Sequence, residues 1–280
     1  MIIRKLISQT QKLLEKHNIP ESYVKYVLNE LFLEKDKNLY DAMDEELSSL
    51  DQKRFDEIIA RLLKDEPLAY VMGVQYFYGY AFDVNPSVLI PRYETEELVL
   101  KVLMELDESF SDDCTLLDIG TGSGAIACVL KAEKPDMKVY ASDISEEALV
   151  QAQKNADKLG VEISFMQGDM AQPFVENKIK ADVIVCNPPY IPQDEVIENS
   201  VKDYEPHVAL FGGEDGLYFY RKVLKDAPSI LNKKSLLAFE MGWNQRESLS
   251  ALVREIFPNA NIECFQDLSG KDRILMVRNF

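Results

Sequence analysis

A short apolar run at residues 115–119 leads directly into the glycine-rich segment 120–124, and a helical pattern begins at about Ala125. Glycines let a backbone pass close to a ligand, and the N-terminus of a helix favours anionic groups. In an open α/β sheet such a turn lies at the carboxyl ends of the strands, where ligands bind. The order of strand, turn and helix therefore predicts an α/β fold that holds a nucleotide-type ligand.

Strands alternate with amphipathic helices from Glu94 onward, which predicts a mostly parallel, Rossmann-like sheet with helices on both faces. Only a short loop joins the last two strands, so we expect them to pair antiparallel. The expected strands cover residues 115–119, 138–142, 162–167, 181–186, 235–240, 261–265 and 274–277. Two later helices are expected at residues 216–231 and 245–257.

The first 70 residues follow a different pattern, because their apolar residues recur at helical spacing without strand-like alternation. Breaks at 18–20, 35–38 and 48–51 divide them into four or five short helices. An aromatic, β-prone stretch around Gly79 then predicts a hairpin, which either packs on its neighbours or forms a wall for a partner. We expect a helical-bundle domain at 1–70, a β-hairpin linker at 71–91 and the α/β domain at 92–280.

The chain is strongly acidic, with 31 Lys and Arg residues against 48 Asp and Glu, a net charge of −17. Residues 1–70 carry 11 basic and 14 acidic side chains, so most of the acidity belongs to the rest of the chain. Such a surface repels polyanions and cannot neutralise phosphates. A free-standing nucleic-acid binder is therefore disfavoured, and we expect no direct nucleic-acid partner.

The cysteines and histidines indicate the compartment and the absence of a metal site. Four cysteines lie far apart inside apolar runs, and with only two histidines no zinc-type spacing exists. Buried, reduced thiols are expected. The N-terminus turns polar too early for a signal peptide, and no apolar run is long enough for a membrane span. We therefore expect a cytoplasmic protein with neither a metal nor a membrane partner.

Two cofactors fit the glycine-rich turn. Gly120, Gly122 and Ala125 match the dinucleotide fingerprint G-x-G-x-x-G/A, and Asp143 ends the next strand at about the expected ~20-residue distance. A carboxylate there can accept both ribose hydroxyls of a nucleoside. Asp169, at the end of the third strand, would lie near an adenine ring. NAD and S-adenosylmethionine both remain open on this evidence, and a glycine turn without a ligand is disfavoured by the ordered set of strand, turn, helix and acid.

The fourth strand ends in Asn187-Pro188-Pro189-Tyr190. Consecutive prolines remove two backbone donors and hold an extended turn, so the Asn187 side-chain oxygen and the Pro188 carbonyl become fixed acceptors. They suit a planar NH₂ group whose face the Tyr190 ring covers. Catalysis would then be mainly positioning and electrostatics while a methyl group moves from sulfonium to nitrogen. Although Asn-Pro-Pro also occurs as a simple stiff turn, hydride transfer has no evident use for this asparagine, so the motif favours S-adenosylmethionine.

With these motifs the chain resembles the N5-glutamine methyltransferases that modify peptide-chain release factors. Asn-Pro-Pro-Tyr alone is shared with adenine-N6 and guanine-N2 methyltransferases, but the resemblance covers nearly the whole chain. Besides the two motifs, it rests on residues 77–79, 90–96, 204–217, 240–245 and 267–273. Two departures are Tyr93, where the family usually has proline, and Met170, where it often has an aromatic residue.

The resemblance implies a seven-stranded methyltransferase sheet with its last strand antiparallel, and methyl transfer from S-adenosylmethionine to the glutamine of the Gly-Gly-Gln motif in release factors. The N-terminal helical domain would help to hold that protein. Cofactor binding would fall on Gly120, Thr121, Gly122, Ser123, Gly124, Asp143, Asp169, Met170 and Asn187. The substrate would be bound by Asn187, Pro188, Pro189 and Tyr190, with Asn187, Pro188 and Tyr190 as the catalytic set.

Two alternative functions fit the sequence less well. An adenine-N6 DNA methyltransferase would need a basic target-recognition region, which the acidic chain does not provide. A non-enzymatic, methyltransferase-like binding module would have no use for intact Asn187 and Asp143. Arg92, Thr95 and Glu240 are each expected to be either structural residues or residues of the site.

Overall fold

The computed structural model describes residues 1–279, and its internal contacts divide the chain into two compact units. One unit comprises Met1–Gly73 together with Glu198–Tyr204, and the other comprises Val74–Ile197 and Glu205–Phe280. We refer to them as the helical unit and the sheet unit. The hairpin segment therefore groups with the sheet unit.

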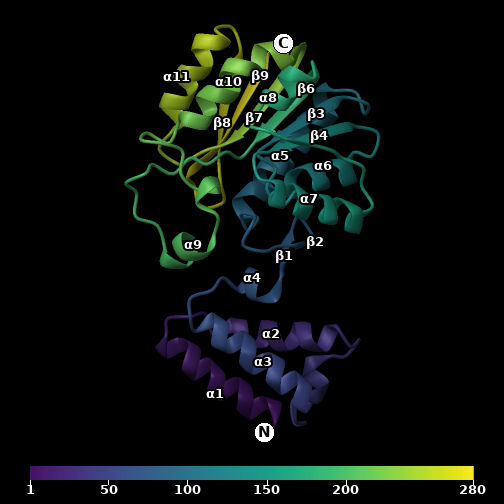
Figure 1. The fold of residues 1–280 in the computed structure, drawn as a ribbon, viewed down its shortest axis with the longest axis vertical. Helices are drawn as coiled ribbons and strands as arrows, with labels where there is room; N and C mark the ends of the chain where they lie inside the picture. The colour runs from purple at the N-terminus through teal and green to yellow at the C-terminus, as the bar shows by residue number, and fades with distance from the viewer. Residues whose placement is uncertain (280) are drawn as a thin grey trace. The chain divides into compact units, whose positions relative to one another are not determined.

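The helical unit is built from short amphipathic helices with no strand among its described residues (Figure 1). Its core consists of the apolar residues at helical spacing, including Ile3, Leu14, Val27 and Phe55. The Ser48 hydroxyl accepts a hydrogen bond from the Asp51 amide (3.1 Å) and caps the third helix. Its helices are α1 (Ile3–Lys16), α2 (Ser22–Leu33), η1 (Leu39–Ala42), α3 (Ser49–Leu62), α4 (Leu68–Met72) and α9 (Asn199–Tyr204).

A seven-stranded sheet forms the centre of the sheet unit, in the order β5-β4-β3-β6-β7-β9-β8. The neighbouring strands from β5 to β7 pair in parallel, and β9 lies antiparallel between β7 and β8. This confirms the predicted fold, including the antiparallel last strand. The strands are β3 (Thr115–Ile119), β4 (Lys138–Asp143), β5 (Ser164–Gln167), β6 (Ala181–Cys186), β7 (Leu231–Glu240), β8 (Asn261–Gln266) and β9 (Asp272–Asn279).

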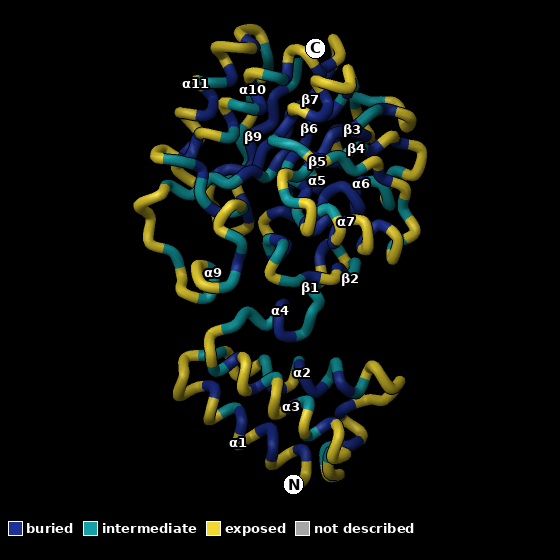
Figure 2. The backbone as a smooth tube through the Cα atoms, viewed as in Figure 1, coloured by how far each residue is buried: buried dark blue, intermediate teal, exposed yellow. Residues whose placement is uncertain are grey.

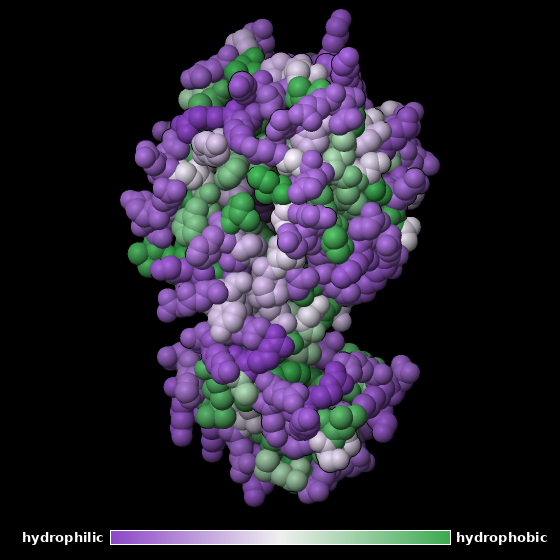
Figure 3. Space-filling model, in the orientation of Figure 1, coloured by the Kyte–Doolittle hydropathy of each residue, from purple (hydrophilic) through white to green (hydrophobic). Residues whose placement is uncertain are grey.

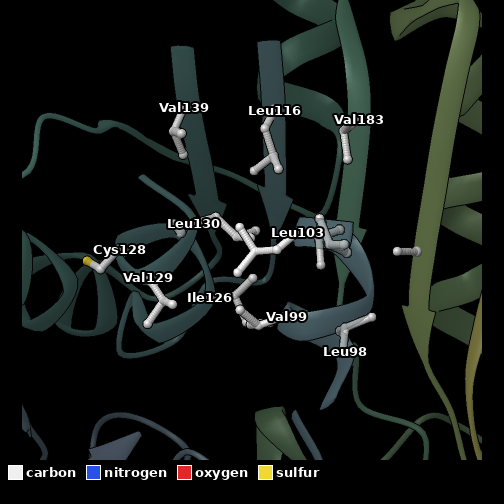
Figure 4. Close-up of a cluster of buried hydrophobic side chains, with 14 of the residues drawn as sticks. Leu98, Val99, Leu103, Leu116, Ile126, Cys128, Val129, Leu130, Val139 and Val183 are labelled. Carbon is white, nitrogen blue, oxygen red and sulfur yellow. The ribbon is translucent and has the colours of Figure 1, made fainter. Parts of the chain in front are cut away.

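Helices cover both faces of the sheet because its central strands are apolar on both sides, and Figure 2 shows these strands as buried. Leu116 and Val183 pack against the helices of one face, whereas Leu117 and Ile184 pack on the opposite face. Figure 4 shows the first of these clusters, in which Leu116, Val139 and Val183 lie opposite Leu103 and Leu130. Successive strand residues point to opposite faces, so this alternation builds two separate cores.

The helices of the two faces come from different parts of the sequence. On the first face lie α5 (Tyr93–Ser109), α6 (Ala125–Glu133) and α7 (Glu146–Leu159), and on the second α8 (Gln172–Glu176), α10 (Tyr218–Ile230) and α11 (Arg246–Ile256). A short 3₁₀ helix, η2 (His207–Ala209), precedes α10. Parallel strands need crossover connections, and the helices of these connections cover the faces of the sheet.

The hairpin pairs β1 (Val74–Phe77) with β2 (Tyr80–Asp83) around a turn at Tyr78 and Gly79. The rings of Phe77 and Phe82 meet edge to face at 6.0 Å and belong to the first core. Buried Asn155 of α7 joins the hairpin by accepting from the Asp83 amide (2.8 Å). The aromatic pair therefore packs on the sheet unit, while Tyr76 stays exposed.

The surface is hydrophilic over most of the face shown in Figure 3, with hydrophobic residues in scattered groups. This distribution agrees with the acidic composition. Within residues 1–279, every helix is too short or too polar to cross a membrane.

Candidate functional site

A cavity of about 270 Å³ lies in the sheet unit beyond the carboxyl ends of β3, β4 and β6. This is the edge at which open α/β sheets bind ligands. Among the predicted site residues, its walls include Gly120, Gly122, Asp143, Asp169, Met170, Asn187 and Pro189. Five other predicted site residues lie within two positions of these in the sequence but do not line this cavity: Thr121, Ser123, Gly124, Pro188 and Tyr190.

The glycine-rich loop is shaped by positive φ angles at Gly120, Gly122 and Gly124. At Gly124 a Cβ atom would lie only 3.0 Å from the Ala152 Cβ, so glycine allows α7 to approach the loop. The amides of Gly120 and Thr121 both donate to the Ser142 carbonyl at 2.9 Å, which ties the loop to β4. The loop is thus held in place before any ligand arrives.

Asp143 ends β4 at the wall of the cavity and is oriented by backbone donors. Its Oδ2 accepts from the Gly122 amide at 2.8 Å, and its Oδ1 accepts from the Ser145 amide at 3.0 Å. Burial raises the pKa of Asp143, while these hydrogen bonds lower it. Each oxygen retains a lone pair, so the carboxylate can also accept from ligand hydroxyls.

Asp118, the last polar residue of β3, is fully buried beneath the loop. Its Oδ2 accepts from the Thr121 hydroxyl (2.6 Å) and from the Ala127 amide (3.2 Å), whereas its Oδ1 has no partner among residues 1–279. Burial raises the pKa of Asp118 to about 7. Asp118 was not among the predicted site residues, although an acid inside an apolar strand is itself a signal of a special position.

Asp169 forms an ion pair with Lys222 of α10, and both residues line the cavity. The Lys222 ammonium also lies 5.3 Å from the centre of the Tyr218 ring. Met170 adopts a positive φ of 52°, and its carbonyl accepts from the Ser142 hydroxyl at 2.8 Å. Lys222 and Phe219 of α10 also line the cavity but were not predicted, because no local pattern shows that α10 approaches Asp169.

Asn187 lines the cavity, and its side-chain nitrogen is bound by Thr95, which does not line it. Nδ2 donates to the Thr95 hydroxyl oxygen at 3.2 Å. Because the nitrogen is held there, Oδ1 is the acceptor that remains for a ligand. Tyr190 turns its hydroxyl away toward Glu240, at 3.3 Å from Oε1, and burial raises the pKa of Tyr190 so that it stays protonated. Thr95 and Glu240 do not line this cavity but contact residues of the motif.

The segment after Pro206 forms another wall of the cavity, through Pro206, Val208 and Ala209. It is bound to the Asn-Pro-Pro-Tyr turn, since the Gly212 amide donates to the Ile191 carbonyl at 2.8 Å. A Cβ at Gly212 would lie 2.5 Å from the Pro189 carbonyl oxygen, so only glycine permits this contact.

Arg92 does not line the cavity either. It forms an ion pair with Glu205, which is buried and also accepts from the Ile90 amide at 3.3 Å. The pair therefore ties the start of α5 to the segment that precedes η2.

Two protein-family models match the chain. One, described as the PrmC N-terminal domain, matches residues 5–73, and the other, described as the Methyltransferase small domain, matches residues 96–204. The first match falls on the short helices of the helical unit, and the second covers the glycine-rich loop and the Asn-Pro-Pro-Tyr motif.

Curated relatives are similar to the chain over most of its length. A release factor glutamine methyltransferase of Bacillus cereus is 43% identical over 238 residues, which are 84% of this chain and 84% of that protein. One of Bacillus subtilis is 45% identical over 213 residues, 75% of this chain and 74% of its own. A third, of Enterococcus faecalis, is 38% identical over 90% of this chain and 91% of its own.

Solved structures support the fold. A methyltransferase from Pyrococcus furiosus has a TM-score of 0.51 at 18% identity, covering 79% of this chain and 96% of its own. A 16S rRNA methyltransferase from Thermus thermophilus has a TM-score of 0.55 at 16% identity, covering 74% of this chain and 50% of its own. At such identities the similarity concerns the fold alone.

Proposed function

The chain belongs to the release factor glutamine methyltransferase family, and from that premise we propose that it methylates the side-chain amide nitrogen (N5) of the glutamine in the Gly-Gly-Gln motif of peptide-chain release factors. The methyl donor is S-adenosylmethionine. The observation that carries this proposal is the Asn187 amide, whose nitrogen is bound to Thr95 and whose oxygen is left as an acceptor beside the cavity.

The residues present fit S-adenosylmethionine. The donor carries hydroxyl groups, an exocyclic amine and positive charge, all of which suit carboxylate acceptors. Asp143 and Asp169 line the cavity and supply such acceptors. Asp143 would hold the ribose hydroxyls, Asp169 and Met170 would lie at the adenine, and the loop from Gly120 to Gly124 would accommodate the rest. The bound donor supplies a methyl group on a positively charged sulfur.

Asn187 and Pro188 bind the substrate amide in this proposal. The Asn187 Oδ1 accepts one N–H of the glutamine and the Pro188 carbonyl accepts the other, which aligns the nitrogen for attack. Accepting hydrogen bonds from both N–H groups draws electron density onto an amide nitrogen that is otherwise a weak nucleophile. As the nitrogen gains the methyl group, the sulfur–methyl bond breaks and one of these protons is released to solvent. The Tyr190 ring and Pro189 complete the contact surface, so Asn187, Pro188 and Tyr190 form the catalytic set.

A DNA base is a less suitable substrate than a protein amide. The net charge of −17 repels a phosphate backbone, and no basic recognition region interrupts it. We assign the helical unit to recognition of the release factor and place the protein in the cytoplasm, without nucleic-acid or membrane partners. The expected domains at 1–70, 71–91 and 92–280 are kept as the functional division.

Transfer of a labelled methyl group from S-adenosylmethionine to a purified, unmodified release factor tests this function. We expect label in the wild-type release factor and none in a variant whose motif glutamine is replaced by alanine. Equal labelling of the two factors would show that the target residue is wrong, and label in DNA but not in release factor would favour the adenine-N6 alternative.

A further inference from the structure

A buried polar network lies behind the Asn-Pro-Pro-Tyr motif and outside the cavity. Thr95, in the first turn of α5, is 5% exposed, and Glu240, at the end of β7, is 2% exposed. The Thr95 hydroxyl donates to the Glu240 Oε2 at 2.6 Å and accepts from the Asn187 Nδ2 at 3.2 Å. One chain of hydrogen bonds therefore joins the asparagine to a carboxylate that does not line the cavity.

The same carboxylate also holds the other end of the motif. Its Oε1 accepts from the Tyr190 hydroxyl at 3.3 Å. Arg273 donates to that hydroxyl at 3.5 Å and is itself fixed by Asp267 at 3.2 Å. Glu240 thus contacts Tyr190 directly and Asn187 through one hydroxyl, so a single side chain braces both ends of the motif.

The direction of these hydrogen bonds determines which atom of Asn187 faces the substrate. An ionised carboxylate can only accept, so the Thr95 hydroxyl must donate its single proton to Glu240. The Thr95 oxygen can then only accept from Asn187, and only the amide nitrogen can donate to it. A rotated amide would instead direct its NH₂ group toward the substrate NH₂ group, and two donors cannot bond.

Two opposing sets of interactions act on the ionised, accepting form of Glu240. Burial raises the pKa of Glu240, whereas the hydrogen bonds from Thr95 and Tyr190 and the positive charge of Arg273 lower it. The negative charge of Glu94 acts in the same direction as burial and raises the pKa of Glu240. A protonated Glu240 could donate to Thr95 and reverse the chain, and replacing the glutamate with glutamine imitates that state.

We propose that Thr95 and Glu240 are positioning residues that fix the orientation of the Asn187 amide, with Oδ1 rather than Nδ2 toward the substrate amide. This inference rests on the proposed function, since it assigns how the acceptor of that reaction is set. Neither residue touches the cofactor or the substrate. Each acts through Asn187, and Glu240 acts through Tyr190 as well.

The test compares T95V, T95S and E240Q with Y220F in the full-length protein. Valine has the shape of threonine without the hydroxyl, and serine retains the hydroxyl. The Tyr220 hydroxyl donates to the Glu240 backbone carbonyl at 2.7 Å, and Tyr220 is buried like Thr95 and Glu240. Y220F therefore removes a neighbouring hydrogen bond but none of those that join Glu240 to Thr95, Asn187 and Tyr190. It serves as the matched control for a general loss of packing.

We expect T95V and E240Q to lower kcat for release-factor methylation by about 100-fold, as for a misplaced reacting group. The KM and calorimetric Kd for S-adenosylmethionine should stay within a factor of about 3, which is below 1 kcal/mol. T95S should restore most of the turnover, and Y220F should retain wild-type kcat. Unchanged kcat in T95V, or an equal loss in Y220F, would overturn the inference.

A second readout does not depend on turnover. The Asn187 side-chain amide protons, identified in NMR spectra by their loss in N187S, should exchange slowly with solvent in the wild type and in T95S. They should exchange faster in T95V. If T95V leaves their exchange unchanged, the Thr95 contact does not hold the amide. If the wild type shows slow exchange but no methyl transfer to release factor, the proposed function fails while the positioning of Asn187 stands.

Discussion

Asn155 of α7 donates a hydrogen bond from Nδ2 to the Ser123 carbonyl, at 2.9 Å, and so joins α7 to the glycine-rich loop. The same nitrogen donates to the Asp83 carbonyl at 3.0 Å, and Asn155 is fully buried. One side chain therefore connects the hairpin, α7 and the glycine-rich loop. Loss of this amide should affect both stability and cofactor binding.

We predict that Asn155→Ala lowers the free energy of unfolding by about 1–3 kcal/mol, because it leaves buried backbone groups without partners. It should also raise the Kd for S-adenosylmethionine several-fold. Gln151→Ala is the control, since Gln151 donates to the same Asp83 carbonyl but makes no hydrogen bond to the loop. Calorimetric titration and denaturant unfolding measure both effects. An equal rise in Kd in the two variants would contradict the role of the Ser123 contact.

Gly216 provides a test of how the segment after Pro206 packs against the Asn-Pro-Pro-Tyr motif. It has a φ of +71°, and a Cβ there would collide with the Tyr190 carbonyl and lie 2.5 Å from the Gln245 Nε2. Gly270 has a similar φ of +75° with nothing within 4 Å of a Cβ. Gly270→Ala should cost only the backbone strain of about 1–2 kcal/mol, and Gly216→Ala should cost clearly more and reduce turnover. Equal melting temperatures for the two variants would contradict this packing.

Asp118 predicts a pH dependence of stability with a defined sign. Burial raises its pKa from 3.8 to about 7, so the folded protein binds this proton more tightly than the unfolded chain. The contribution is fully present below pH 3.8 and is lost as the pH rises to about 7. Relative to the wild type, Asp118→Asn should therefore gain up to about 4 kcal/mol in unfolding free energy between pH 4 and 7.

Asp215→Asn is the control for this experiment. The ion pair with Arg221 and the Leu217 amide lower the pKa of Asp215 to about 2, so its titration lies below the measured range. Its difference from the wild type should stay constant between pH 4 and 7. A constant difference for Asp118→Asn as well would show that the buried carboxyl does not titrate in this range.

The cofactor and the substrate amide are assigned to different residues, and this separation can be measured. Asp143→Ala should weaken S-adenosylmethionine binding, because the carboxylate held by Gly122 and Ser145 is lost. Asn187→Ala should leave that binding largely intact and lower turnover by about 100-fold or more. Calorimetry and initial rates distinguish the two variants. Wild-type turnover in Asn187→Ala would contradict its role.

Local patterns predicted most of the fold. The alternation of apolar strands and amphipathic helices gave the parallel sheet, and the short connection between 261–265 and 274–277 gave the antiparallel pair. The position of β9 between β7 and β8 was not predicted, because pairing between strands distant in sequence depends on packing of the whole sheet. The short helices α8 and α9 were also missed, since they are too short to show a period.

The site was predictable where its residues are adjacent in sequence. The glycine-rich loop, Asp143 and the Asn-Pro-Pro-Tyr turn each follow a strand, so their common edge could be inferred. Thr95 lies 92 positions from Asn187 and 145 from Glu240, and only the folded sheet brings them together. Lys222 depends in the same way on how α10 packs. Such contacts carry no local signal in a single sequence.

This protein should methylate the motif glutamine of a release factor on its side-chain nitrogen. Tandem mass spectrometry of the peptide that contains Gly-Gly-Gln, after incubation with the enzyme and S-adenosylmethionine, tests it most directly. We expect one added methyl group on the glutamine side-chain nitrogen, and none when Asn187→Ala replaces the wild-type enzyme. An unmodified peptide, or a methyl group on another residue, would contradict it.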